Sequence, residues 1–258
     1  MTTVTPKEGW HWVKRGFQLF RKQPADILTL FFLYMFVNMG IGLIPFAGQF
    51  LPFILIPVFA MSFMQACRQL DAGQRAYPNV LLSGFRSRAL HRLVGLGVLY
   101  LIAATLAIFA SNLVDDGAFW EFVTSQKPVD DNSLPESGLF LGMLFSGLMY
   151  LPALMGFWFA APLITWGDMS VGKAIFYSFF SVYRAGKAFL VYGISWLCIG
   201  VIIPTIISLL LAIIAGKAIV VVLAMMPVSA ILTAVMYCSF YPTYTDLFGK
   251  PDKIDQLA

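Results

Sequence analysis

Three aspartates occupy comparable places in the chain, each shortly after a long apolar run. Asp71, Asp168 and Asp246 follow a proline inside such a run by nineteen, sixteen and nineteen residues. Carboxylate oxygens are the ligands that Ca²⁺ and Mg²⁺ prefer, so three of them meeting at one face could hold a divalent cation. Because basic residues lie near each aspartate in the sequence, we expect salt bridges or loop contacts instead and predict no metal site.

Thiols and imidazoles do not form a reactive cluster either. The three cysteines (Cys67, Cys198 and Cys238) fall inside or at the ends of apolar runs, and the two histidines (His11 and His91) do not cluster with them. No Cys-x-x-Cys pair or Cys/His set with zinc or haem spacing is present. A membrane enzyme needs a nucleophile, a base or a metal cluster at an interface. We therefore predict no catalytic residue, no cofactor and no enzymatic activity.

The composition identifies the class of protein. The chain has 258 residues, of which 59% are hydrophobic and 12% are charged. Soluble domains average about half apolar and a quarter charged, and a soluble protein of this length cannot bury so much apolar side chain. A cytosolic enzyme, a disordered chain and a disulfide-stapled secreted domain are excluded. The net charge of +4 is explained by loops facing anionic lipid, so we expect no nucleic-acid partner.

Six apolar runs are long enough to cross a hydrocarbon core of about 30 Å as helices. They cover residues 25–43, 46–66, 93–113, 139–165, 188–214 and 218–241. Backbone groups in lipid must be hydrogen-bonded within the segment, and the alternating pattern of membrane strands is missing, so the runs are helices. The predicted fold is all-α, a polytopic integral membrane protein with six transmembrane helices in three hairpins.

The basic residues predict the orientation. Fifteen of the seventeen lysines and arginines fall in the two termini and in the segments after the second and fourth runs; only Lys127 and Lys217 fall on the other side. The positive-inside rule then places both termini in the cytoplasm of an inner membrane. The acidic loop at 114–137 would be periplasmic, and 247–258 would be a cytoplasmic tail.

An amphipathic segment precedes each hairpin. The first, between residues 10 and 22, carries an apolar stripe with Trp10, Trp12, Phe17 and Phe20 on or beside it, opposite a basic face. Such helices lie in the membrane interface, and we expect these four aromatics to be interfacial anchors; packing on the protein's own loops is the alternative. Similar patterns occur at 81–92 and 173–184.

The same order of elements therefore occurs three times. The units cover about 9–68, 78–166 and 170–246 within one membrane domain, 1–258. Parallel repeats of this kind predict pseudo-threefold packing about an axis along the membrane normal. Five glycines within the spans are expected to allow close helix approach: Gly95, Gly97, Gly142, Gly147 and Gly156.

The opening motif resembles that of a known family. Gly9-Trp10-His11-Trp12, followed by the run from Gly16 to Pro24 (the pattern G-W-x-W…G-F-x-L-F-R-K-x-P), is similar to bacterial inner-membrane proteins of unknown function. The likeness runs end to end and includes Gly84-Phe85-Arg86. More distantly, the helix-plus-hairpin pattern resembles the membrane domain attached to some glycerophosphodiester phosphodiesterases, whose catalytic residues have no counterpart here. The resemblance implies location and architecture and no chemistry.

The remaining candidates are basic residues near the inner headgroup level. They are Arg21, Lys22, Arg86, Arg88, Arg92, Arg184 and Lys187. Each can contribute about 1 kcal/mol of attraction to an anionic surface, and we interpret them as lipid-headgroup contacts. Every charged residue lies at a span end or in a loop, with Asp26 the deepest, and the missing midplane charge disfavours an ion-coupled transporter. We expect a non-enzymatic protein that handles or contacts membrane phospholipids. The alternatives are an accessory subunit with a membrane-protein partner or a homo-oligomer, and a small-solute channel.

Overall fold

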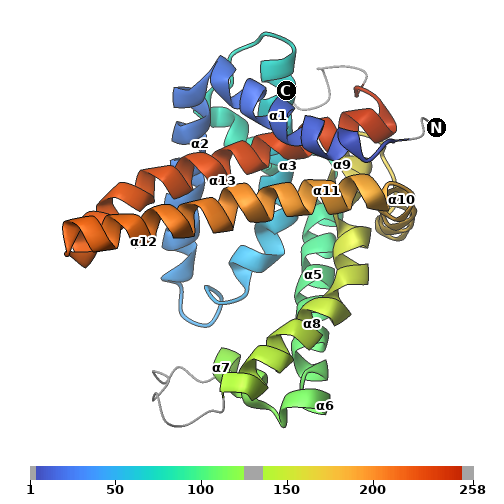
Figure 1. The fold of residues 1–258 in the computed structure, drawn as a ribbon. Helices are drawn as coiled ribbons and strands as arrows, with labels where there is room; N and C mark the ends of the chain where they lie inside the picture. Colours follow the sequence, from blue (N-terminus) through green and yellow to red (C-terminus); the bar gives the residue numbers. More distant parts are fainter. Residues whose placement is uncertain (1–3, 125–135, 252–258) are drawn as a thin grey trace.

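Helices are the only regular elements among the residues that the structure describes. This computed structural model describes residues 4–124 and 136–251 (Figure 1). The elements are α1 (Lys7–Lys22), α2 (Pro24–Gly42), α3 (Leu51–Asp71), η1 (Pro78–Leu82), α4 (Ser83–Arg86), α5 (Leu90–Ala110), α6 (Asn112–Asp115), α7 (Ala118–Thr124), α8 (Glu136–Phe157), α9 (Ala160–Thr165), α10 (Val171–Arg184), α11 (Gly186–Leu197), η2 (Cys198–Ile202), α12 (Ile203–Ala215) and α13 (Ala218–Phe248).

The six predicted spans are confirmed. Helices long and apolar enough to cross a membrane cover 24–42, 51–71, 90–115, 138–165, 186–215 and 218–248. The second span begins at Leu51, later than expected, because residues 43–50 form turns in which Phe46 takes a φ of 61°. The last span continues past Tyr241 to Phe248, although Pro242 lies inside the helix.

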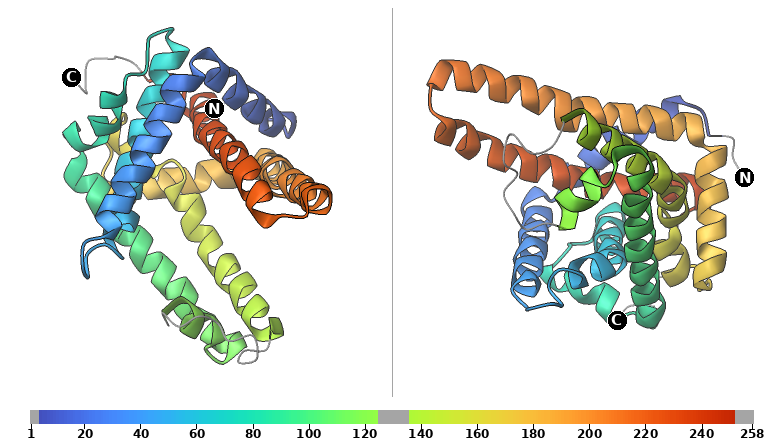
Figure 2. Two further views of the ribbon diagram at one scale, coloured as in Figure 1. Left: turned by 90° about the vertical axis from the view of Figure 1, so that its left-hand side faces the viewer. Right: turned by 90° about the horizontal axis from the view of Figure 1, so that it is seen from below.

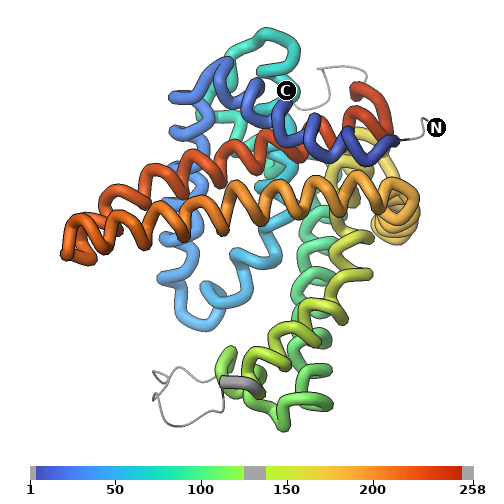
Figure 3. Tube along the Cα trace, viewed as in Figure 1, coloured from blue at the N-terminus to red at the C-terminus, as the bar shows by residue number. Residues whose placement is uncertain are grey.

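The three hairpins diverge from one shared region. Figures 1 and 2 show α2 with α3, α5 with α8, and α12 with α13 as pairs that leave this region in different directions. The α12–α13 pair crosses the direction of α5 and α8 at a steep angle in Figure 1. The long fifth span stays one rod because α11, a π-helical turn at η2 and α12 follow each other without a break, as the trace in Figure 3 shows.

The buried core lies at one end of the hairpins, and we call it the hub. The hub is formed by buried residues of 12–31, 58–70, 76–96, 157–164, 174–196 and 234–244. These are α1 and α10, the first turns of each outgoing span and the last turns of each returning span. The outer halves of the spans, which we call the arms, remain mostly uncovered. Phe36, Leu148 and Ile214, for example, are 63%, 62% and 81% exposed.

The amphipathic segments differ from one unit to the next. Helices α1 and α10 form as predicted ahead of the first and third hairpins. The predicted helix at 81–92 is broken into the 3₁₀ turn η1, the short α4 and the first turn of α5. The break follows from Ser87, which takes an extended backbone after α4 and whose Oγ accepts a hydrogen bond from Ala89 N at 3.1 Å.

Helix α1 packs on the protein, so two expected anchors must be corrected. Trp12 is fully buried and Phe20 is buried, because the face formed by 9, 12, 13, 16, 19 and 20 lies against α11 and α13. Trp12 is surrounded by the rings of Phe189 and Tyr192. Trp10 is 41% exposed, and Phe17 is half-buried and stacks on Trp196. The face of α1 that is buried is therefore rotated about the helix axis from the apolar stripe that the sequence predicted.

A small residue followed by phenylalanine recurs where each unit meets the preceding one. Gly16 lies against Ser239 of the sixth span, and Gly84 lies against the Val58 carbonyl oxygen of the second. At the third position, Ser178 Oγ donates to Met155 O at 2.8 Å and accepts from Phe159 N at 2.9 Å. The contacts join unit one to two, two to three and three to one, so the units close a ring around the hub.

Candidate lipid-contact site

The three aspartates at the ends of the spans form ion pairs. Asp71 lies 2.6 Å from Lys250 Nζ, Asp168 lies 2.5 Å from Arg92, and Asp246 lies 2.5 Å from Arg15. The described residues include no group of three His, Cys, Asp or Glu side chains that could hold a metal ion. Each of these carboxylates therefore joins elements far apart in the sequence, and the three do not meet.

The buried tryptophan of α1 takes part in one of these pairs. Trp12 Nε1 donates to Asp246 Oδ2 at 2.8 Å, while Arg15 bonds the other carboxylate oxygen and reaches Thr245 Oγ1 at 3.2 Å. Hydrogen bonds to an ionised acceptor are stronger than those between neutral groups. The first and last helices of the fold are therefore fixed to each other at the hub end.

A fourth ion pair holds the loop after the second span. Arg75 Nε donates to Asp26 Oδ2 at 3.0 Å, and the Asp26 carboxylate raises the pKa of the Arg75 guanidinium above its ordinary value. Gln23 holds the same loop through Gln74 O and Ala76 N. These contacts connect the start of the first span to the end of the second.

The acidic loop begins with a buried carboxylate rather than a solvated one. Asp115 is 7% exposed, and its two oxygens accept hydrogen bonds from Gly117 N at 3.1 Å and Phe119 N at 2.9 Å. It thereby caps the start of α7, where free N–H groups favour a negative charge. Residues 125–135 of the predicted loop, and 252–258 of the predicted tail, lie outside the described residues.

The basic candidates separate into several places around the hub end. Lys22 Nζ donates to Leu70 O at 3.1 Å, and Arg86 lies beside Gln69, so both stand near the last turns of α3. Arg92 is held by Asp168 and by Met169 O. The others, Arg21, Arg88, Arg184 and Lys187, are exposed, and Arg184 stands beside the end of α13. The structure thus distributes these charges around the hub instead of forming one cluster.

A comparison with curated proteins establishes the family. The chain is 36% identical, over 251 residues, to Probable inner membrane protein BTH_II0599 of Burkholderia thailandensis; the match covers 95% of this chain and 93% of that protein. The chain belongs to this family of inner-membrane proteins. No protein-family model and no solved structure matches it. Together with its six spans, the relationship makes it a multi-pass integral inner-membrane protein.

The uncovered arms are apolar enough to lie in the hydrocarbon of an inner membrane. Lipid tails are as apolar as leucine, so an exposed aliphatic surface at this depth costs nothing and needs no protein cover. The arms of the third hairpin are the least covered, since none of the most apolar stretch of 186–215 is buried.

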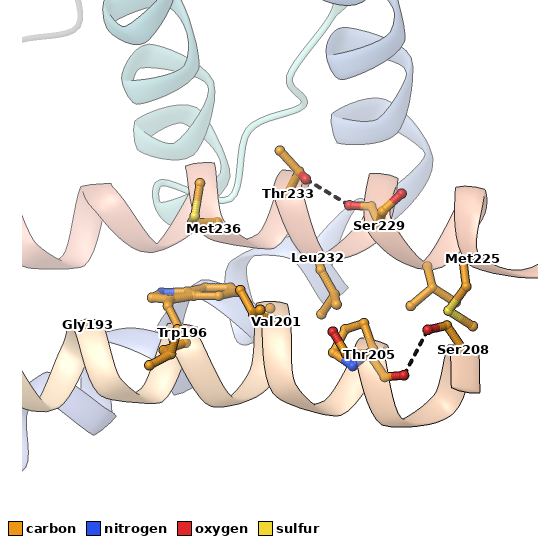
Figure 4. A pocket seen from close by; sticks show the side chains of 14 residues that line it. Gly193, Trp196, Val201, Thr205, Ser208, Met225, Ser229, Leu232, Thr233 and Met236 are labelled. Atoms are coloured by element: carbon orange, nitrogen blue, oxygen red, sulfur yellow. Dashed lines mark hydrogen bonds between the residues drawn. The ribbon is translucent and has the colours of Figure 1, made fainter. Parts of the chain in front are cut away.

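A long groove follows the third hairpin of this inner-membrane protein. It has a volume of about 600 Å³ and lies between the fifth and sixth spans (Figure 4). Trp196 closes the hub end, and Ser208 and Met225 lie toward the other. The hydroxyls of Ser208, Ser229 and Thr233 bond the backbone of their own helices, so the groove offers mainly apolar contact.

A second cavity lies beside α10 at the hub end. It measures about 360 Å³ and is lined by Phe176, Tyr177, Phe180 and Arg184 of α10 and by the end of α13. Phe176 is 61% exposed and Tyr183 is 68% exposed. Aromatic rings beside a guanidinium are typical of a helix at the level of the lipid headgroups.

Sequence reasoning missed the residues that bring the helices together. Gly9, Gly16 and Gly84 allow backbone approach, and their signal is the repeated small residue before an aromatic one. Arg68 follows the predicted run 46–66, yet it lies within α3 and is only 7% exposed. It donates to Pro251 O at 3.3 Å and lies over the Trp166 ring.

Proposed function

We propose that this inner-membrane protein engages phospholipids without catalysing a reaction, organising the bilayer around it or supporting lipid passage. One observation carries the proposal: the protein core is confined to the hub, and three pairs of apolar arms diverge from it. A helical protein that only had to persist in the membrane could bury its arms against each other. Separate arms instead present apolar surface to acyl chains on several sides.

The charges at the hub end support the same function. Exposed Arg21, Arg88 and Lys187 stand near the ends of the spans, where headgroup phosphates lie. An anionic surface attracts each such charge by about 1 kcal/mol. We propose further that this end faces the cytoplasm. The termini and the segments after the second and fourth spans carry fifteen of the seventeen basic residues, and the positive-inside rule places such segments in the cytoplasm.

Two other functions stay open as outcomes of the test. An accessory subunit would use the same arms to dock a partner protein, and a channel would use the groove of the third hairpin for a solute. The distant resemblance to the membrane domain of glycerophosphodiester phosphodiesterases fits a lipid setting and assigns no reaction here.

Native mass spectrometry after gentle extraction from the membrane tests the proposal. The wild-type protein is expected to retain phospholipids, and the double variant Arg21→Glu/Arg88→Glu is expected to retain fewer anionic ones. The control is Lys217→Glu, at the turn between α12 and α13, far from the hub. A chain recovered without lipid in a stoichiometric complex with another protein would refute lipid engagement and favour the accessory subunit.

A further inference from the structure

A polar cavity lies at the hub end of the second span. It has a volume of about 180 Å³ and is bounded by the last turns of α3 and by η1 and α4. Its lining is unlike that of the other two cavities, because it consists of Gln65, Gln69, Asn79, Ser83 and Arg86, with Tyr77 and Val80 at the edge. It stands within two turns of Asp71, the last residue of the span.

Three polar atoms of this cavity have no hydrogen-bond partner in the protein. They are Gln65 Oε1, Gln69 Oε1 and Ser83 Oγ, and all three are buried. Gln65 as a residue is only 4% exposed, and Ser83 is 7% exposed. Buried polar groups are nearly always paired, and each unpaired one destabilises a protein appreciably. Three of them around one cavity indicate that the cavity holds a polar occupant.

The lining suits an occupant that has both an anionic group, for Arg86, and a hydrogen-bond donor, for the unpaired glutamine oxygens. Arg86 supplies the only charge of the lining, and Ser83 and the glutamine and asparagine amides supply neutral donors. Asp71, two residues after Gln69, is paired with Lys250. One guanidinium balances the single charge of a phosphodiester, whereas free phosphate carries nearly two at neutral pH. The amide oxygens remain for a hydroxyl or an ammonium group beyond the phosphate.

We propose that this cavity, which we call the Arg86 cavity, binds a phosphodiester, carried by a phospholipid headgroup. The inference rests on the proposed function, because the cavity stands at the level where headgroups of bound lipid lie. It adds a defined place and a chemical class to a general contact with lipid. A soluble phosphate compound shares the chemistry, and the test separates the two sources.

The chain offers a matched pair of arginines for the test. Arg86 and Arg88 are both exposed and flank Ser87, but only Arg86 lines the cavity. Arg86→Gln is expected to lower the retention of bound phospholipid about tenfold or more, as loss of a charge-assisted contact does. Arg88→Gln is expected to change the binding of glycerophosphoethanolamine less than about twofold, because Arg88 does not line the cavity. Its effect on lipid retention is that of a surface charge. Gln65→Leu removes an unpaired buried atom at similar volume, so it is expected to fold as well as wild type and still lose the lipid.

The assay has two arms. Native mass spectrometry measures retained phospholipid, and ³¹P NMR titration of the detergent-solubilised protein measures binding of glycerophosphoethanolamine and of inorganic phosphate. The proposal expects the diester to bind more tightly than phosphate, with loss in Arg86→Gln and Gln65→Leu. Equal loss in Arg86→Gln and Arg88→Gln, or no binding of any probe to wild type, would overturn it, and the cavity would hold water only. Tighter binding of inorganic phosphate than of the diester would overturn the lipid source.

Failure of this proposal is distinguishable from failure of the proposed function. If the wild-type protein retains lipid that neither arginine variant affects, lipid engagement stands and the Arg86 cavity is overturned. If it retains no lipid but binds glycerophosphoethanolamine through Arg86, the phosphodiester site stands and lipid engagement fails.

Discussion

Replacing Gly84 by alanine tests how the units join at the hub. A Cβ on Gly84 would lie closer than 3.0 Å to the Val58 carbonyl oxygen, a distance that real Cβ atoms do not reach. The obstacle is backbone of α3, so α4 must move away. The movement would also break the bond from Gly84 N to Ser62 Oγ at 3.1 Å, and Ser62 Oγ itself donates to Leu81 O at 2.7 Å.

The expected loss of stability follows from these contacts. Overpacking costs about 1–3 kcal/mol, and the lost buried hydrogen bond adds about 1 kcal/mol. For a chain of this length, a total of about 2–4 kcal/mol lowers the melting temperature by roughly 5–15 °C. The matched control is Gly95→Ala on α5, where no atom lies within 4 Å of the added Cβ. It should raise stability by up to about 1 kcal/mol, because alanine favours a helix over glycine.

The melting temperatures of both variants and of wild type are measured in the same detergent, with size-exclusion chromatography to monitor the folded fraction after heating. Gly84→Ala is expected to melt clearly below wild type, and Gly95→Ala at or above it. If the two variants melt within about 2 °C of each other, α4 does not rest on α3 as described, and the ring of small-residue contacts is wrong.

The same assay checks two further contacts. Ser178→Ala leaves the buried Phe159 N–H without its acceptor and should lower the free energy of unfolding by about 1–3 kcal/mol. The control Ser208→Ala loses only a bond within its own exposed helix and should cost nearly nothing. Equal melting temperatures of the two variants would contradict the link from α10 to the fourth span. Trp12→Phe keeps an aromatic ring but loses the bond to Asp246, and it should lower the free energy of unfolding by about 1.5–3 kcal/mol. Trp10→Phe, at a half-exposed position of the same helix, is the control. An unchanged melting temperature for Trp12→Phe would refute the role of that bond.

Part of the candidate site could be predicted from the sequence. The basic residues could be chosen as candidates from charge and position alone, on which the positive-inside rule acts, and their contact with lipid stays a prediction. The pairing of Asp168 with Arg92 could not be found, since the two residues are 76 positions apart. The Arg86 cavity was also beyond prediction, because Gln65 and Gln69 look like ordinary polar residues at the end of a span until η1 and α4 cover them.

Helix α1 shows where residue type misleads. Its aromatics indicated an interfacial helix, yet Trp12 and Phe20 are interior residues. Hydrophobic periodicity reports that a face avoids water, and it does not say whether lipid or protein covers that face. Only the position of Gly9 and Gly16, against α11 and α13, shows that protein does.

The sequence by itself determined the spans, because the cost of leaving backbone groups unpaired in lipid depends on local composition and length. It also determined the order of segments and a break ahead of each hairpin, whereas the side of the membrane on which the charges gather stays a prediction. The tertiary structure decided which residues carry contacts. Gly95 and Gly97 share one motif, but only Gly97 lies against the backbone of Ile54. The physical reason is that close packing depends on which turn of a helix meets a neighbour, and that is set by the hub and not by the run of apolar residues.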